Sequence, residues 1–237
     1  MMDTAAVDVA FKECPNKVTA PFEQWIRAAF DHPPKEPEWY WDEDFDSFWD
    51  SIGLSEAVTV SYLTRLFLEP NHLKPYSLPQ VAQGIWFLIS GSSPSKACYG
   101  LINPGIELGE RVPCIRAMAE FFRNFVAPAT HGPAETDSDP FHGACYMWWD
   151  ILPFRPWRGE PLEGEPDVHN ACVNAMTEIL QLPSDVCRIS ALHGLNHWQE
   201  HYTEQVERVI DSFLRNTTEI APRMREYAMQ ARAGLCQ

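Results

Sequence analysis

The sequence lacks the features that mark secreted and membrane proteins. Its seven cysteines are scattered, odd in number and without a CxxC spacing, which argues against a disulfide framework. We therefore expect a reducing, cytoplasmic environment, where free cysteines pack as small apolar side chains. The N-terminus shows no secretory signal pattern. Apolar runs such as Ile85–Ile89, with five residues, are short, whereas a membrane-spanning helix needs about 20, so we expect no membrane association.

Basic charge is also scarce. The chain has 18 Lys and Arg against 33 Asp and Glu, which gives a net charge of −15. Nucleic acids and anionic membrane surfaces bind to basic surfaces, and we expect neither as a partner. The acidic surplus would favour a basic protein partner through long-range attraction, and it also keeps a protein in solution.

The sequence contains no familiar catalytic motif. There is no P-loop, GxGxxG, GxSxG or zinc-binding cysteine set. Cys187 and His193 do not share a helical face, so no cysteine–histidine nucleophile is predicted. The carboxylates of Asp42 and Asp46 lie on an acidic helix face and are expected to be solvated. We assign no catalytic residue, no metal ligand and no cofactor.

Alternating strand patterns are absent, and helical patterns fill the chain, so we predict an all-α fold. Residues 1–20 are predicted to be an irregular segment and residues 21–237 a single helical domain. The predicted helices are Pro21–Phe30, Trp41–Ile52, Ser55–Leu68, Ser77–Ser90, Pro113–Val126, Asp139–Leu152, His169–Leu182, Ser184–Trp198, Thr203–Arg215 and Ala221–Ala233. Successive helices are expected to stack as antiparallel pairs in units of roughly forty residues, as in HEAT and armadillo arrays. A compact multi-helix bundle is the alternative.

The stretch Cys187–Arg215 has the clearest helical periodicity and the densest group of histidines. Its first helix is apolar on most of its circumference, so we expect neighbours on most sides. Gly194 lies in the middle of that helix, where glycine costs roughly 1 kcal/mol relative to alanine. We therefore expect another helix to approach closely there.

His193, His197 and His201 follow one another at intervals of four residues. A pair at this spacing can chelate zinc, but the zinc-protease motif needs glutamate directly after the first histidine, where Gly194 stands. We interpret His193 and His197 as mainly structural, buried beside Ser190 and hydrogen-bonded within the protein.

Five residues are candidates for binding a ligand or partner: His193, Asn196, His197, Trp149 and Asp150. Asp150 follows two tryptophans, an environment that suits a pocket carboxylate. The competing interpretation pairs it with Arg155 or Arg158.

Three segments, PQVAQGIWFLI, SALHGLNHW and YAMQARAG, resemble bacterial proteins of unassigned function with a HEAT-like helical fold. The resemblance covers the larger, C-terminal part of the chain. It implies an α-α array and brings no activity and no catalytic residue.

Three functions remain open from the sequence. The first is a non-enzymatic interaction or scaffold protein of helical-repeat type. The second is an acidic immunity-type neutraliser of a basic toxin. The third is a helical protein that binds a metal or a small molecule through His193 and His197.

Overall fold

The computed structural model describes residues 20–42, 49, 51–130, 139–154, 164–217 and 219–236. All regular secondary structure within these residues is helical, which confirms the predicted all-α class. The longer helices are α1 (Phe22–Phe30), α3 (Glu56–Leu68), α4 (Leu78–Ile89), α5 (Leu108–Phe121), α7 (Pro140–Ile151), α8 (Glu165–Leu180), α9 (Asp185–Trp198), α10 (Thr203–Asn216) and α11 (Pro222–Arg232). The short helical turns are η1 (Trp39–Trp41), η2 (Pro70–Leu73), η3 (Ala97–Leu101), the π-helical η4 (Phe122–Val126) and α6 (Ala127–Ala129).

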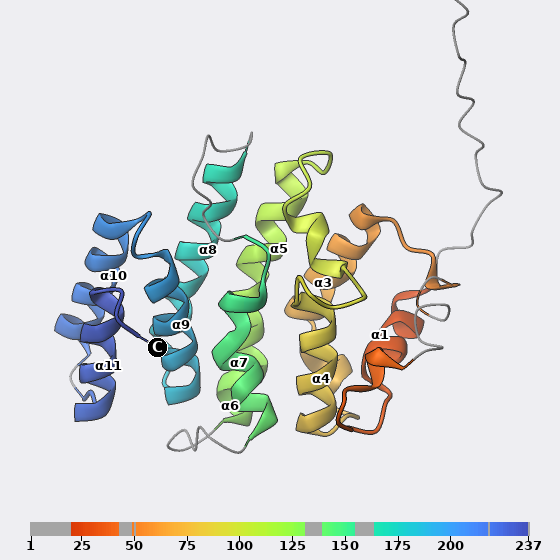
Figure 1. Ribbon diagram of the computed structural model, residues 1–237, viewed down its shortest axis with the longest axis horizontal. Coiled ribbons are helices and arrows are strands. Elements are labelled where there is room, and N and C mark those ends of the chain that lie inside the picture. The colour runs from red at the N-terminus through yellow and green to blue at the C-terminus, as the bar shows by residue number, and fades with distance from the viewer. Residues whose placement is uncertain are drawn as a thin grey trace, which may run out of the picture.

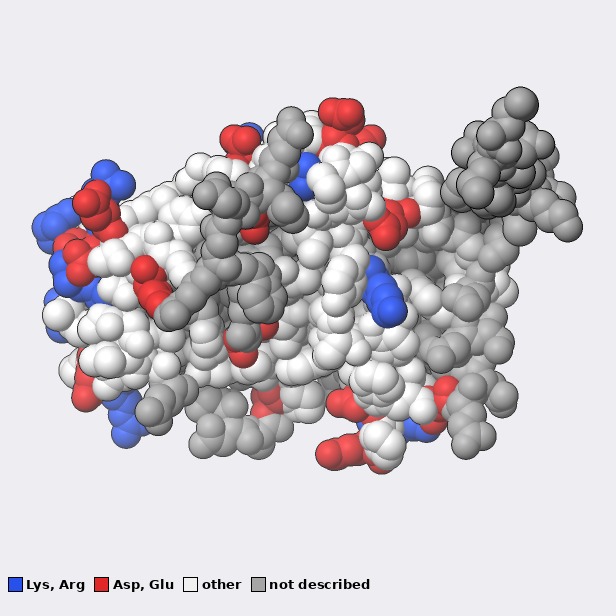
Figure 2. Space-filling model, turned by 45° about the horizontal axis from the view of Figure 1, so that its top comes forward, with Lys and Arg blue, Asp and Glu red and all other residues white. Residues whose placement is uncertain are grey.

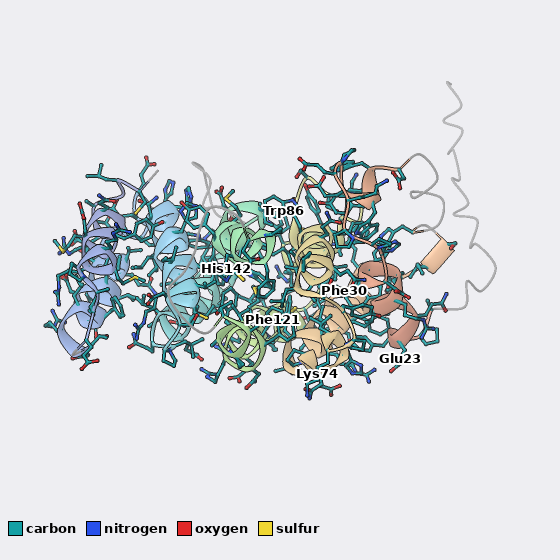
Figure 3. All side chains as sticks on the ribbon, turned by 90° about the horizontal axis from the view of Figure 1, so that it is seen from below. Glu23, Phe30, Lys74, Trp86, Phe121 and His142 are labelled. Carbon is teal, nitrogen blue, oxygen red and sulfur yellow. The ribbon has the colours of Figure 1, made fainter. Side chains whose placement is uncertain are left out.

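The helices lie in two rows that pack against each other, as the end-on view of Figure 3 shows. One row runs through α3, α5 and α8, and the other through α1, α4, α7, α9 and α11, with each helix contacting the next. Two pairs of helices that are adjacent in the chain also contact each other, α8 with α9 across the rows and α10 with α11 at the end of the array. The chain thus progresses from α1 at one end to α10 and α11 at the other (Figure 1).

An aromatic cluster forms the centre of the core. The ring of Phe121 in α5 lies 5.6 Å from that of Trp148 in α7, measured between centroids, and 5.7 Å from that of Phe67 in α3. All three side chains are fully buried. Aromatic pairs at these separations contribute about 0.5–1.5 kcal/mol beyond the burial of their area, so this cluster ties the two rows together.

Side chains cap the starts of several helices. The side chains of Ser55, Asp139 and Ser184 each accept a hydrogen bond from a backbone N–H in the first turn of the following helix. Ser77 and Gln80 form a capping box, in which the backbone N–H of Ser77 donates to the Gln80 side chain over 3.0 Å. These bonds satisfy N–H groups that the helix itself leaves without partners.

Two predicted helix starts are wrong. α5 begins at Leu108 and includes Pro113. In its first turn Arg111 is buried, and its Nε donates to the Ile106 carbonyl over 2.8 Å. A buried charged residue such as Arg111 does not appear in a pattern of apolar residues, so the pattern does not reveal the first turn of α5. α8 begins at Glu165, four residues before the predicted start. α10 begins at Thr203, as predicted, and the Thr203 hydroxyl donates to the Gln199 carbonyl of the preceding turn.

The predicted helix Trp41–Ile52 is also wrong at its start. Asp42 has an extended backbone, which ends the short turn η1 and interrupts the predicted helix. Trp41, at the predicted start, is 53% exposed. Towards the predicted end, Trp49 is half-buried and Ile52 is buried. Residues 43–48 and 50 lie outside the described residues.

No helix in the described part of the chain is long and apolar enough to cross a membrane. The predicted irregular segment, residues 1–20, lies outside the described residues except for Ala20. The carbonyl of Ala20 accepts a hydrogen bond from the Tyr62 hydroxyl over 2.9 Å, so the described chain is anchored to α3 where it begins.

Candidate functional site

Helix α9 places the histidines, and it is enclosed as its sequence predicts. It contacts α7, α8 and α11, and most of its residues are buried. Gly194 allows the closest of these approaches. A Cβ atom added there would lie 2.5 Å from the sulfur of Met176 in α8 and 2.6 Å from Cγ of Trp149 in α7. Any side chain at this position would therefore push α9 away from its neighbours.

The structure brings His193, His197 and Asp150 together between α9 and α7. The Nε2 atoms of the two histidines are 3.1 Å apart, and Nε2 of His197 lies 3.4 Å from an oxygen of Asp150. One ligand atom from each of the three residues lies within 4.8 Å of the other two. Two imidazoles and a carboxylate can bind a transition metal in this arrangement, or they can form a hydrogen-bonded chain.

Two tyrosines from neighbouring helices contact the imidazole of His193. The Tyr227 hydroxyl of α11 lies 3.3 Å from Nδ1 of His193. The ring of Tyr146 in α7 covers the imidazole, with 3.9 Å between ring centroids. Burial raises the pKa of the Tyr227 phenol well above its usual range, and a hydrogen bond with Tyr146 raises it further. Tyr227 therefore remains a neutral phenol at physiological pH.

The burial of the site is graded. His193 is buried, with 5% of its surface exposed, whereas the side chains of His197 and Asp150 are 31% and 17% exposed. The sequence prediction of a buried histidine is thus confirmed for His193 and wrong for His197.

The predicted hydrogen bonding within the protein is confirmed for His193, which interacts with Tyr227 of a neighbouring helix, but Ser190 is not its partner. Ser190 is fully buried, and its hydroxyl has no hydrogen-bond partner. The imidazole of His193 instead interacts with residues of its own helix and of α11. The predicted pairing of Asp150 with Arg155 or Arg158 involves arginines outside the described residues.

Trp149 and Asn196 have roles beside the cluster. Trp149 is buried against Gly194, and its indole N–H has no hydrogen-bond partner. The side-chain amide of Asn196 both donates to the Cys236 carbonyl and accepts from the Cys236 N–H, over 3.3 and 2.9 Å. Asn196 thereby holds the segment after α11 against α9.

Sequence reasoning missed Tyr146 and Tyr227. For Tyr146 a signal exists, because His142, Tyr146 and Asp150 follow one another at intervals of four and share a face of α7. His193 and His197 have the same spacing of four residues on α9. For Tyr227 the sequence holds no comparable signal, since its position depends on how α11 packs against α9.

The buried cysteines are poor candidates for chemistry. Burial raises the pKa of Cys114 to about 12 and that of Cys187 to about 11, and it raises the pKa values of Cys145 and Cys172 well above the usual range. The nucleophile in cysteine chemistry is the thiolate, and these thiols stay protonated at neutral pH.

A cavity of about 370 Å³ lies between the start of α3 and the turn before η3. Its lining includes Trp49, Glu56, Thr59 and Lys96. Lys96 has a left-handed backbone, with φ of 49°, which is uncommon for a residue of its size. None of the five candidate residues lies in this cavity.

No protein-family model, no curated protein and no solved structure matches the chain.

Proposed function

We propose that the chain is a non-catalytic interaction protein of helical-repeat type, with stacked antiparallel pairs of the HEAT and armadillo kind. The observation that supports it most is the order of the helix contacts, in which each helix of a row meets the next one along. Arrays built in this way present extended surfaces to their partners. A compact bundle, the alternative, would offer less continuous surface.

An acidic edge indicates where a partner would bind. We use this name for Glu107, Glu110, Glu165 and Asp167, at the starts of α5 and α8. These two helices contact each other and begin at the same edge, the top in Figure 1. Acids in a first turn stabilise a helix by about 0.3–1 kcal/mol, so they also serve the fold. Grouped together, they offer a negative surface to a partner.

The rest of the charge distribution supports a basic partner at this edge. From Thr203 onward the chain has five acidic residues and five arginines, so the whole surplus of −15 lies before that point. Figure 2 shows basic side chains gathered mainly at the end formed by α10 and α11. A basic protein would therefore be attracted to the α5–α8 side and repelled from parts of the far end.

The test is affinity capture from the native host with two sets of variants. The first set, Glu107→Gln, Glu110→Gln and Asp167→Asn, removes three exposed charges of the acidic edge. The matched set, Asp31→Asn, Glu219→Gln and Glu226→Gln, removes three exposed charges elsewhere. We expect a basic partner whose recovery falls with added salt and with the first set alone. Equal recovery with both sets would contradict the acidic edge.

Neutralisation of a basic toxin is a special case of this function. It requires that the partner be toxic alone and harmless in the complex, which a growth assay measures. A neighbouring gene for a basic toxin would favour it over a general scaffold. A cytoplasmic location is part of the proposal, and it is supported by the free cysteines among the described residues.

A further inference from the structure

We propose that Asp150, His193 and His197 bind one divalent transition-metal ion, for which Zn²⁺ is the probe, between α7 and α9. This inference does not depend on the proposed interaction with a basic partner. It rests on three ligand side chains that the fold brings within 4.8 Å of one another.

The distances suit the coordination sphere of such an ion. Zinc binds imidazole nitrogen at about 2.0–2.1 Å in a tetrahedron, which places neighbouring ligand atoms about 3.3 Å apart. Nε2 of His197 lies 3.1 Å from Nε2 of His193 and 3.4 Å from the Asp150 oxygen. Two of the three edges of the ligand triangle thus already have the required length. Side-chain rotation at Asp150 can adjust the third.

The environment of His193 directs the correct nitrogen at the ion. Its Nδ1 atom faces the Tyr227 hydroxyl over 3.3 Å, while its Nε2 atom faces His197. Histidines that bind metals commonly donate the other ring N–H to an oxygen, which fixes the tautomer and the ring orientation. Tyr227 can accept that hydrogen bond, and the ring of Tyr146 limits rotation of the imidazole.

The ligand set indicates the class of metal. Imidazole ligands suit zinc, iron, nickel and copper, whereas magnesium and calcium prefer oxygen ligands alone. Three protein ligands leave at least one coordination position for water or another molecule. Because His197 and Asp150 are partly exposed, that position can be reached from solvent.

A hydrogen-bonded chain without a metal is the competing explanation. A separation of 3.1 Å between two imidazole nitrogens also fits one N–H donating to the other ring. The chain would run from Asp150 through His197 and His193 to Tyr227. The two explanations differ in whether the protein binds metal stoichiometrically, and a titration measures this.

The experiment is calorimetric titration of the full-length, untagged protein with Zn²⁺ after treatment with a chelator. Co²⁺ is titrated in parallel, because its visible spectrum reports the coordination number, and Mg²⁺ serves as a negative control. The variants are Asp150→Asn and His197→Gln, which change partly exposed ligands. The matched control is His201→Gln, which removes the third, exposed histidine of the same series. Circular dichroism establishes that each variant is folded.

We expect one Zn²⁺ per chain and a Co²⁺ spectrum of low coordination number. Asp150→Asn and His197→Gln should each weaken binding by about 100-fold or more, because loss of even an outer-shell partner costs about 10–100-fold. His201→Gln should bind like the wild type. The absence of saturable Zn²⁺ binding would overturn the proposal in favour of the hydrogen-bonded chain. Equal binding by the wild type and both ligand variants would also overturn it, because the metal would then lie elsewhere.

Discussion

Gly194 and Gly143 both lie inside helices, and they differ in what surrounds them. A Cβ at Gly194 would collide with Met176 and Trp149, whereas a Cβ at Gly143 would meet nothing within 4 Å. We expect Gly194→Ala to lower the free energy of unfolding by about 1–3 kcal/mol through overpacking. Gly143→Ala should raise it by roughly 0.5–1 kcal/mol, because alanine favours the helix. Urea denaturation of both variants measures the difference, and similar values for the two would refute the close approach.

A second prediction at this scale concerns His169, which is buried in α8. Burial lowers its pKa, and the nearby Glu165 carboxylate opposes this by raising it. The unfolded chain therefore binds the proton more readily than the folded protein does. Stability should fall as the pH drops from about 6.5, the usual histidine pKa, towards the lower pKa of the folded state, and it should be unaffected above that range.

Thermal denaturation between pH 7 and pH 5 checks the prediction for His169. His169→Gln should reduce the loss of stability over this range. Glu165→Gln removes the opposing charge and should extend the loss to lower pH. A His169→Gln variant with the same pH dependence as the wild type would show that His169 is not responsible.

At the scale of helices, the start of α9 carries a prediction about capping. The Ser184 hydroxyl accepts from the Cys187 N–H over 3.3 Å and also lies 2.8 Å from the Thr130 hydroxyl, in a buried position. The Ser55 hydroxyl accepts from the Val58 N–H over the same distance but is exposed. Ser184→Ala should cost about 2 kcal/mol, because it also removes the buried hydrogen bond that the Ser184 hydroxyl donates to Thr130, whose own hydroxyl donates to the Val126 carbonyl. Ser55→Ala should cost about 1 kcal/mol or less.

Chemical denaturation of the two serine variants tests this difference. Equal losses would mean that the hydrogen bond between Ser184 and Thr130 adds nothing to the cap. A larger loss for Ser55→Ala would contradict the expected role of burial.

Helices show how far sequence reasoning reaches and where it stops. The spacing of His193 and His197 predicts their common face, because residues four apart lie together on any helix. Capping residues predict the starts of α3, α7 and α9 for the same local reason. Asp150 and Tyr227 join the cluster only through contacts of α7 and α11 with α9. Such contacts depend on packing between segments far apart in the chain, which no local pattern encodes.

At the scale of the whole molecule, the two rows predict uneven stability. α5 and α7 lie in the middle of the rows, whereas α11 lies at one end and buries mainly Met224, Ala228 and Ala231. In arrays where each unit contacts its neighbours, the ends open more readily than the centre. We expect amide hydrogen exchange, measured by mass spectrometry, to be slowest in α5 and α7 and faster in α11. Uniform exchange in all helices would favour the compact bundle.

The absence of a side chain at Gly194 also affects how the candidate site is held. The indole of Trp149 in α7 occupies the space that a side chain at position 194 of α9 would need. This close packing opposes any sliding of α7 along α9. Asp150 lies in α7, and His193 and His197 lie in α9. The packing at Gly194 therefore keeps the three side chains close together in the absence of a bound metal ion. The cluster is in this sense preorganised, and binding there should cost little ordering entropy. The lack of a Cβ methyl group at Gly194 would thus determine how rigid the whole site is.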